Sequence, residues 1–470
     1  MSLARNATAS QSPTQTNGYE RHQPDQTLLY QLVEQHYPAF KASLEAQGQH
    51  LPRYIQQEFN DLLQCGRLEY GFMRVRCEDC HHERLVAFSC KRRGFCPSCG
   101  ARRMAESAAL LIDEVFPKEP IRQWVLSFPF QLRFLLARHP QLMGQVLSIV
   151  YRTLSTHLIK KAGYTKASAQ TGSVTLIQRF GSALNLNVHY HMLFLDGVYA
   201  EDDYGKQRFH RVKAPTYDEL NTLAHTLSHR IARCMEKRGI LERDAENTWL
   251  TLEEGEDDTL TQLHGASVTY RIAVGPQQGR KVFTLQTLPG REDKADSSSR
   301  VANHAGFSLH AGVMAEAHQR DKLERLCRYI SRPAVSEKRL ALTANGQVRY
   351  ELKTPYRNGT THVIFEPLDF IALPVGVQRR FECVEAPLGE PEGLLLGMIG
   401  GNCGACHDLA FARDGGTIRT VPHGKPAQVA GIIRDFTLSE SFAPRAGVQR
   451  LSFDRHLPGK APPPLPGGTP

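Results

Sequence analysis

One segment in the middle of the chain constrains the fold more than any other. Residues 188–197 are filled with apolar and aromatic side chains and end in an Asp-Gly turn signal, which is typical of a β-strand. Alternate side chains of a strand share a face, so His189 and His191 point the same way, with Cα atoms roughly 7 Å apart. Two imidazoles at this spacing can bind one metal ion, although the same pair also occurs in half-exposed strands with ordinary histidines.

A second strand precedes this one. Residues 173–180 are typical of a strand, and residues 181–187 turn the chain back, which predicts a hairpin in the centre of a sheet. Helical periodicity covers residues 28–64, punctuated by Pro38 and Pro52, and residues 104–165. Further elements are expected as helices at 225–238 and 321–330 and as strands at 268–273, 281–288, 347–352 and 361–365.

The overall composition narrows the class of protein. The 470 residues suffice for two to four domains, and the formal net charge of +9 suits a polyanionic partner. The first residues are polar and do not resemble a secretory signal, and no apolar run approaches the ~20 residues of a membrane span. We therefore expect a cytoplasmic protein with no membrane partner.

The cysteines predict a metal site. Eleven cysteines are present, and Cys77-x-x-Cys80 and Cys96-x-x-Cys99 form two knuckles at zinc-site spacing. Four thiolates in a tetrahedral arrangement make a closed, structural Zn²⁺ site. Cys90 lies between the knuckles and could replace one of the four, and His81 or His82 could also compete.

Basic residues surround these knuckles. Arginines mixed with the aromatic side chains of Phe88 and Phe95 are typical of contacts with a nucleic-acid backbone and of base stacking. The arginines assigned to DNA binding here are Arg92, Arg93, Arg102 and Arg103. The alternative is a solvated zinc platform that only packs against its neighbours. A third pair, Cys403-x-x-Cys406-His407, matches a haem-attachment pattern but is interpreted as accidental.

The helix at 321–330 carries a candidate nucleophile. Leu323, Cys327 and Ile330 share an apolar stripe, and Tyr329 lies on its flank. A boundary tyrosine of a packed helix is the ordinary interpretation. The functional one is attack on a phosphodiester, assisted by a divalent metal. The positive charges that would surround such a tyrosine are Arg325, Arg328 and Arg332.

Taken in order, these motifs resemble a known family. The cysteine run is followed by Phe180-Gly181-Ser182-Ala183-Leu184-Asn185, by His189-x-His191, by Gly306-Phe307-Ser308-Leu309-His310 and by Arg328-Tyr329-Ile330-Ser331-Arg332-Pro333. Over about residues 28–371 the set resembles the rolling-circle transposases of the insertion sequence ninety-one family, and most closely their common-region branch.

The resemblance implies an α+β fold of the HUH-endonuclease type. A central antiparallel sheet flanked by helices would carry the two histidines, preceded by a small cysteine-rich zinc-binding domain and helices. His189 and His191 would bind Mg²⁺ or Mn²⁺, with His310 or Gln178 as a candidate third ligand. Tyr329 would attack single-stranded DNA at an insertion-sequence end and leave a 5′-phosphotyrosine.

Composition, periodicity and the resemblance together suggest domain boundaries. We expect a disordered leader at 1–27, the helical and zinc-binding domain at 28–105, a helical connector at 106–170 and the catalytic domain at 171–371 with an insertion at about 200–300. Residues 372–470 differ from the family's usual ending and are expected to form a loosely ordered tail. Family members with two catalytic tyrosines carry the second one four residues after the first, where this chain has Pro333.

Two other functions are compatible with these motifs. A plasmid relaxase or rolling-circle replication initiator would share the tyrosine chemistry. A non-enzymatic zinc-ribbon DNA-binding protein, or an inactive transposase remnant, would need only the cysteine region.

Overall fold

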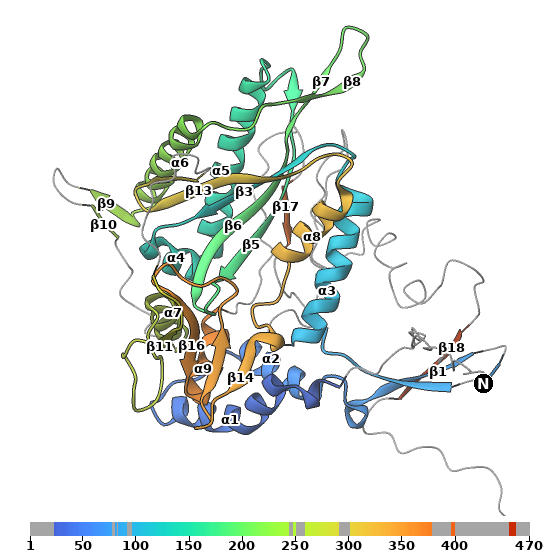
Figure 1. The fold of residues 1–470 in the computed structure, drawn as a ribbon, viewed down its shortest axis with the longest axis vertical. Helices are drawn as coiled ribbons and strands as arrows, with labels where there is room; N and C mark the ends of the chain where they lie inside the picture. Colours follow the sequence, from blue (N-terminus) through green and yellow to red (C-terminus); the bar gives the residue numbers. More distant parts are fainter. Residues whose placement is uncertain are drawn as a thin grey trace, which may run out of the picture.

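The computed structural model describes residues 23–77, 80–81, 83–91, 96–243, 248–250, 259–290, 301–377, 396–399 and 451–456. Its centre is a six-stranded sheet in the order β12-β13-β3-β6-β5-β17, antiparallel except for the β17–β5 pair (Figure 1). The strands are β3 (Ile121–Ser127), β5 (Ser173–Phe180), β6 (Leu186–Leu195), β12 (Val301–His304), β13 (Phe307–Ala315) and β17 (Leu396–Ile399). The fold is therefore α+β with antiparallel sheets, as predicted.

The predicted central hairpin is confirmed. β5 and β6 pair antiparallel, with Gln178 opposite His189 and Leu176 opposite His191. The turn between them is closed by a 2.8 Å hydrogen bond from the Gly181 amide to the Asn185 carbonyl. The histidine-bearing strand therefore has a hydrogen-bonded neighbour on each side, β5 and β3.

β3 corrects the prediction of an all-helical segment at 106–170. This strand pairs with both β6 and β13 and lies in the middle of the sheet. Nearly all of it is buried, so it shows no alternation of apolar and polar residues. Arg122 and Gln123 also interrupt its apolar character, and both side chains are buried in the folded protein.

Helices cover both faces of the sheet. One face packs on α4 (Phe130–Arg138), α5 (Pro140–Lys161) and α6 (Tyr217–Glu236), with Trp124, Tyr190 and Phe194 in the core between them. The other face packs on α3 (Pro97–Leu110) and α8 (Arg320–Ile330), which are adjacent in Figure 1. The helix predicted at 321–330 is thus confirmed, and its apolar stripe is buried.

A second core lies beside the central sheet. It contains α1 (Leu28–Glu45), α2 (Arg53–Gln64), α7 (Thr259–Thr269) and α9 (Pro367–Val377). A four-stranded sheet joins them, with β11 (Phe283–Gln286), β16 (Thr360–Phe365), β15 (Val348–Glu351) and β14 (Leu340–Leu342) in that order.

Two local predictions for the helices α1 and α7 differ from the structure. Pro38 lies inside α1 and does not end it. The strand predicted at 268–273 is instead the end of α7 and a turn, with only an isolated bridge between Arg271 and Lys281. Val268 packs in the core between the central sheet and the helices α4, α5 and α6, which explains its apolar character without a strand.

Smaller sheets complete the described chain. β1 (Phe72–Cys77) and β2 (Glu83–Ala87) form a hairpin, and β18 (Leu451–His456) pairs with β1. β7 (Gly197–Glu201) and β8 (Gln207–Arg211) form a second hairpin, which extends from the top of the molecule in Figure 1.

Parts of the predicted domain scheme lie outside the described residues. These are nearly all of the leader and most of the tail, of which only the end of α9, β17 and β18 are described. None of the helices described has both the length and the hydropathy needed to cross a membrane.

Candidate active site and cysteine cluster

His189 and His191 lie on the sheet face that α8 covers. Residues directly opposite each other on paired strands project to the same face, so Gln178 of β5 accompanies His189. Gln123 of β3 is opposite Leu193 and therefore also shares this face. Further along the same face, Leu193 belongs to the apolar core beneath α3 and α8. The polar residues thus form one compact patch at the edge of the apolar core beneath α3 and α8.

The two histidines are adjacent and uncharged. Their ring centroids are 4.9 Å apart, with an angle of 67° between the planes. Burial lowers the pKa of His189 to about 4 and the pKa of His191 well below its usual value, and the positive charge of Arg332 acts in the same direction. Neutral imidazole is the form that binds metal ions. A 2.7 Å hydrogen bond joins Nδ1 of His189 to the Asn187 carbonyl, which leaves Nε2 for another partner.

The two residues named as a third ligand differ in their position. Nε2 of Gln178 donates to the Ile330 carbonyl at 2.6 Å, while its Oε1 is buried with no hydrogen-bond partner in the described part of the chain. That oxygen, on the residue opposite His189, is an unsatisfied hydrogen-bond acceptor and could bind a metal ion. His310 pairs with Val125, which in turn pairs with His191, so it lies two strands away, about 10 Å by strand spacing. Gln178 is therefore nearer to the histidine pair along the sheet than His310 is, and the third ligand stays a prediction.

Gln123 was missed by the sequence reasoning. Its Nε2 lies 2.7 Å from Nδ1 of His191, and both side chains are buried. Recognition of β3 as a strand next to β6 would have identified it. Every side chain of such a strand projects to one of the two sheet faces, and that of Gln123 projects to the face of the histidines. Without that strand, nothing in the sequence links position 123 to position 191.

Tyr329, in the last turn of α8, lies beside His191. Its ring centroid is 6.2 Å from that of His191, with the rings perpendicular, and the residue is 36% exposed. The hydrogen bond from Gln178 to the Ile330 carbonyl attaches the end of α8 to the sheet. Buried Leu323, Cys327 and Ile330 hold the opposite side of the helix. Tyr329 is thus both positioned by the fold and open to solvent.

Two cations contact the tyrosine ring. Cζ of Arg332 lies 4.1 Å from the ring centroid, and Nζ of Lys353 lies 3.7 Å from it. Arg332 also donates through Nη1 to the Tyr329 carbonyl at 2.7 Å. Burial lowers the pKa of Arg332, but a guanidinium stays charged across the physiological range. Lys353 follows β15 and was not anticipated, because 24 positions of sequence separate it from Tyr329.

The other predicted DNA-binding arginines are spread over two helices. Arg325 and Arg328 are exposed on α8, and Arg328 forms an ion pair with Glu324 at 2.6 Å. Arg102 is exposed on α3, and Arg103 is half-buried. Arg92 and Arg93 lie outside the described residues.

A four-thiol cluster lies at the start of α3. It consists of Cys65, Cys90, Cys96 and Cys99, whose sulfur atoms are all within 4.8 Å of one another. Sγ of Cys65 is 3.8 Å from that of Cys96 and 3.6 Å from that of Cys99. A tetrahedral zinc with Zn–S bonds of about 2.3 Å places its sulfur ligands about 3.8 Å apart. The thiols are therefore arranged as a zinc ion requires.

This cluster corrects the predicted ligand set. Cys96 and Cys99 are present and Cys90 joins them, but Cys65 takes part where Cys77 and Cys80 were expected. Cys80 is exposed and belongs to no such cluster among the described residues, which do not include the side chain of Cys77. His81 is likewise exposed, whereas His82, Cys403 and Cys406 fall in undescribed parts of the chain.

The hairpin explains the difference. Cys77 and Cys80 lie at the tip of the β1–β2 hairpin, whereas Cys65 precedes it and Cys90 follows it. A 2.9 Å hydrogen bond from the Gly66 amide to the Phe88 carbonyl closes the base and brings Cys65 next to Cys90. Five residue steps of strand separate base from tip by about 17 Å. The Cys-x-x-Cys spacing therefore predicted the wrong partners for Cys96 and Cys99.

Two protein family models match the chain, one over each of the segments that contain these sites. A model of the transposase zinc-binding domain matches residues 32–128, and a transposase family model matches residues 172–375. The chain belongs to the insertion sequence ninety-one (IS91) family of transposases. No curated protein and no solved structure gives a match. The common-region branch stays a prediction.

Family membership defines the general activity of this IS91-family transposase. It acts in DNA transposition, with DNA as its binding partner and DNA cleavage as its chemistry. The zinc-binding model contains the four-thiol cluster, and the transposase model contains His189, His191 and Tyr329.

Proposed function

We propose that this transposase nicks single-stranded DNA at the end of its insertion sequence through attack by Tyr329. One observation carries the proposal. The ring of Tyr329 lies edge-on to the imidazole of His191, which adjoins that of His189, and the tyrosine ring is contacted by two cations. A tyrosine that served only to pack α8 would not need this environment, since the apolar side of the helix is already buried.

The residues present fit a divalent metal ion. His189 and His191 are neutral and adjacent, and the unsatisfied Oε1 of Gln178 offers an oxygen on the same sheet face. Imidazole nitrogen also suits Zn²⁺ and Fe²⁺, so the choice of Mn²⁺ or Mg²⁺ rests on the oxygen of Gln178 and on the family resemblance. When bound, such an ion withdraws charge from the scissile phosphate.

The chain's own residues would supply the remaining chemistry. The phenolic oxygen of Tyr329 forms a bond to phosphorus, and its proton passes to water. The bond from phosphorus to the 3′ oxygen breaks, and that oxygen takes up a proton to become a free 3′-OH. Arg332 and Lys353 stabilise the negative charge that develops on the phosphate and the phenolic oxygen. The strand stays attached through a 5′-phosphotyrosine, so its later transfer needs no ATP.

The chain uses one tyrosine in this scheme. The position four residues after Tyr329 is Pro333, which lies just beyond the end of α8. Strand transfer between two tyrosines of one active site is therefore not available to this chain through that position.

The four-thiol cluster would hold a structural zinc ion. Cys65, Cys90, Cys96 and Cys99 fill all four tetrahedral positions, so no open position is left for catalysis. The ion would join the base of the β1–β2 hairpin to the start of α3, which packs against α8. We propose that it contributes DNA affinity and positioning, and not bond breakage.

A denaturing gel tests this function. The full chain is incubated with labelled single-stranded element-end DNA and Mn²⁺ or Mg²⁺, and a protein–DNA adduct that resists SDS is expected. Tyr329→Phe should abolish it, whereas Tyr217→Phe, at an exposed tyrosine of α6, should not. Normal binding without an adduct would support the zinc-ribbon binder or inactive remnant instead. Preferred cutting at a plasmid origin would support a relaxase or replication initiator.

A further inference from the structure

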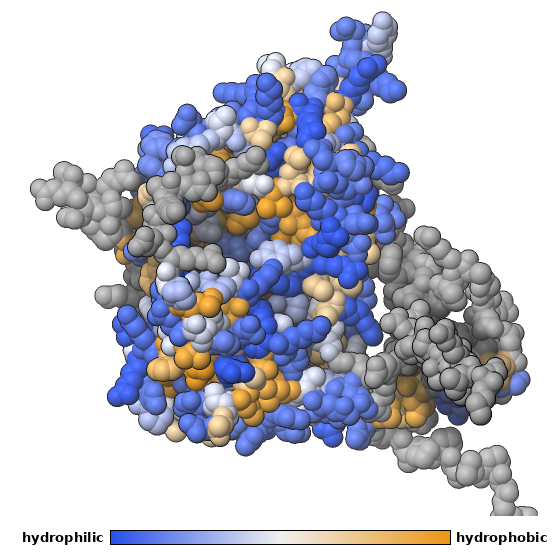
Figure 2. Space-filling model, in the orientation of Figure 1, coloured by the Kyte–Doolittle hydropathy of each residue, from blue (hydrophilic) through white to orange (hydrophobic). Residues whose placement is uncertain are grey.

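A groove of about 600 Å³ opens at the other end of α8 from Tyr329. Residues from the central sheet, from the segment after β8 and from α8 line it. The polar ones are Arg122, Asp196, Arg211, Lys213 and Lys322. Figure 2 shows mostly hydrophilic side chains on the projecting β7–β8 hairpin and both hydrophilic and hydrophobic ones around α8.

The charges in the groove do not cancel. Asp196 neutralises the charge of Arg122, because Nε and Nη2 of Arg122 donate to the two carboxylate oxygens of Asp196 at 2.6 and 2.8 Å. Arg211 forms a 2.7 Å ion pair with Glu316. Lys213 and Lys322 are exposed and pair with no carboxylate among the described residues; Lys322 only approaches the Gln319 amide oxygen at 3.5 Å. Two uncompensated ammonium groups therefore face the same groove.

α8 connects this groove to the active site. Lys322, Arg325 and Tyr329 are spaced by three and four residues, so they lie on one side of the helix, and all three are exposed. The rise from Lys322 to Tyr329 is about 10 Å. A positively charged path thus runs along α8 from the nucleophile to the groove.

We propose that this groove binds backbone phosphates of the single strand that reaches Tyr329. The inference rests on the proposed function for the identity of the strand, and on the two lysines for the binding itself. Lysine ammonium groups contact phosphates without reading bases, so the site holds and orients the strand whatever its sequence. The buried Arg122–Asp196 pair lines the groove together with the exposed Lys213 and Lys322.

Binding of a fluorescein-labelled 20-nucleotide oligothymidylate tests the groove without any cleavage step. Each phosphate contact on a single strand contributes about 0.7 to the slope of log affinity against log salt concentration. Lys213→Ala with Lys322→Ala, made in a Tyr329→Phe background, should weaken binding several-fold and reduce this slope by about 1.4. Lys213→Arg with Lys322→Arg should keep both. Lys160→Ala with Lys237→Ala removes the same charge from exposed positions on α5 and beyond α6, and serves as the control.

The outcomes separate the two proposals. An equal change in slope for the groove and control variants would contradict the proposal that the groove binds backbone phosphates. If the groove variant alone loses slope but the unmodified chain never forms an adduct, the groove stands and tyrosine nicking fails. If adduct forms but the slope is unchanged in the groove variant, nicking stands and the strand takes another path.

Discussion

Gln123 and His191, on neighbouring strands of the central sheet, are joined by a 2.7 Å contact between the amide Nε2 and the ring Nδ1. Which ring nitrogen of His191 carries the proton depends on which atom of the Gln123 amide faces Nδ1. Metal binding through Nε2 requires a proton on Nδ1, and the Gln123 amide must then turn to present its oxygen as the acceptor. Gln123 is therefore a positioning residue for a proposed metal ligand.

Replacing Gln123 should weaken metal-dependent nicking without unfolding the protein. Gln123→Met removes the acceptor at similar volume, and loss of such a partner typically costs 10–100-fold in metal affinity or activity, so about that loss is expected. Gln123→Glu keeps an acceptor and should retain most of the metal affinity. Adduct yield titrated against Mn²⁺ measures both. Equal activity of Gln123→Met and the unmodified chain would show that the contact plays no part.

Cys65 should be required for zinc, and Cys80 should not. Cys65→Ser removes one of the four ligands and should lower the zinc content, measured by atomic emission, by about one ion per chain. Because zinc binding contributes directly to folding of such sites, the melting temperature should fall as well. Cys80→Ser, at an exposed thiol outside the cluster, is the matched control. Loss of zinc in Cys80→Ser alone would restore the ligand set that the sequence suggested.

The buried Arg122–Asp196 pair should be sensitive to removal of one partner. The two side chains are only 3% and 2% exposed, so Arg122→Met leaves an unpaired buried carboxylate and should lower the free energy of unfolding by about 3–5 kcal/mol. Adding Asp196→Leu should recover most of the loss. Arg208→Ala breaks a pair of the same length whose arginine is 63% exposed, and should cost less than about 1 kcal/mol. Urea unfolding distinguishes these outcomes.

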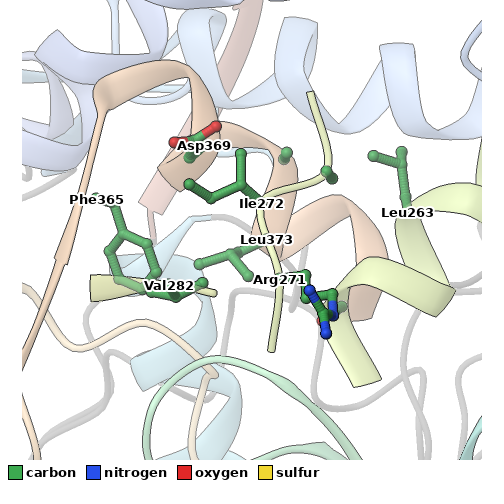
Figure 3. A pocket seen from close by; sticks show the side chains of 10 residues that line it. Leu263, Arg271, Ile272, Val282, Phe365, Asp369 and Leu373 are labelled. Atoms are coloured by element: carbon green, nitrogen blue, oxygen red, sulfur yellow. The ribbon is translucent and has the colours of Figure 1, made fainter. Parts of the chain in front are cut away.

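Asp369 should make stability depend on pH. It lines a small cavity with Ile272, Val282 and Phe365 (Figure 3), and burial, together with the Glu366 carboxylate, raises its pKa to about 7. Because the pKa is higher in the folded state than the usual 3.8, its contribution is fully present below about pH 4 and is lost as the pH rises through about 7.

Asp369→Asn isolates this contribution. The variant should lose part of the decrease in melting temperature that the unmodified chain shows between pH 5 and pH 8. A parallel decrease in both proteins would assign the pH dependence to other groups.

The sequence alone predicted the parts of the site that are local. The hairpin of β5 and β6 and the helix of Tyr329 follow from periodicity over a few residues, and each was found within two residues of its expected bounds. The histidine pair follows from the same strand. These features need no knowledge of the rest of the chain.

What could not be predicted depends on the path of the chain. β3 escaped because a strand buried on both faces has no alternation, and Gln123 escaped with it. Cys65 joins the thiol cluster only because the β1–β2 hairpin brings its base together and carries Cys80 away. Lys353 reaches Tyr329 from the sheet of the second core. Each case is a contact between segments that the sequence keeps apart.

Identification of the residue that carries the DNA tests the central claim most directly. After incubation with a short single strand and Mn²⁺, digestion with trypsin and nuclease should yield the peptide 329–338, since trypsin cuts after Arg328 but not before Pro333. Mass spectrometry should then find a nucleotide attached through its 5′ phosphate to Tyr329, the only tyrosine in that peptide. A nucleotide on any other residue, or a nicked strand with no attached peptide, would contradict the account.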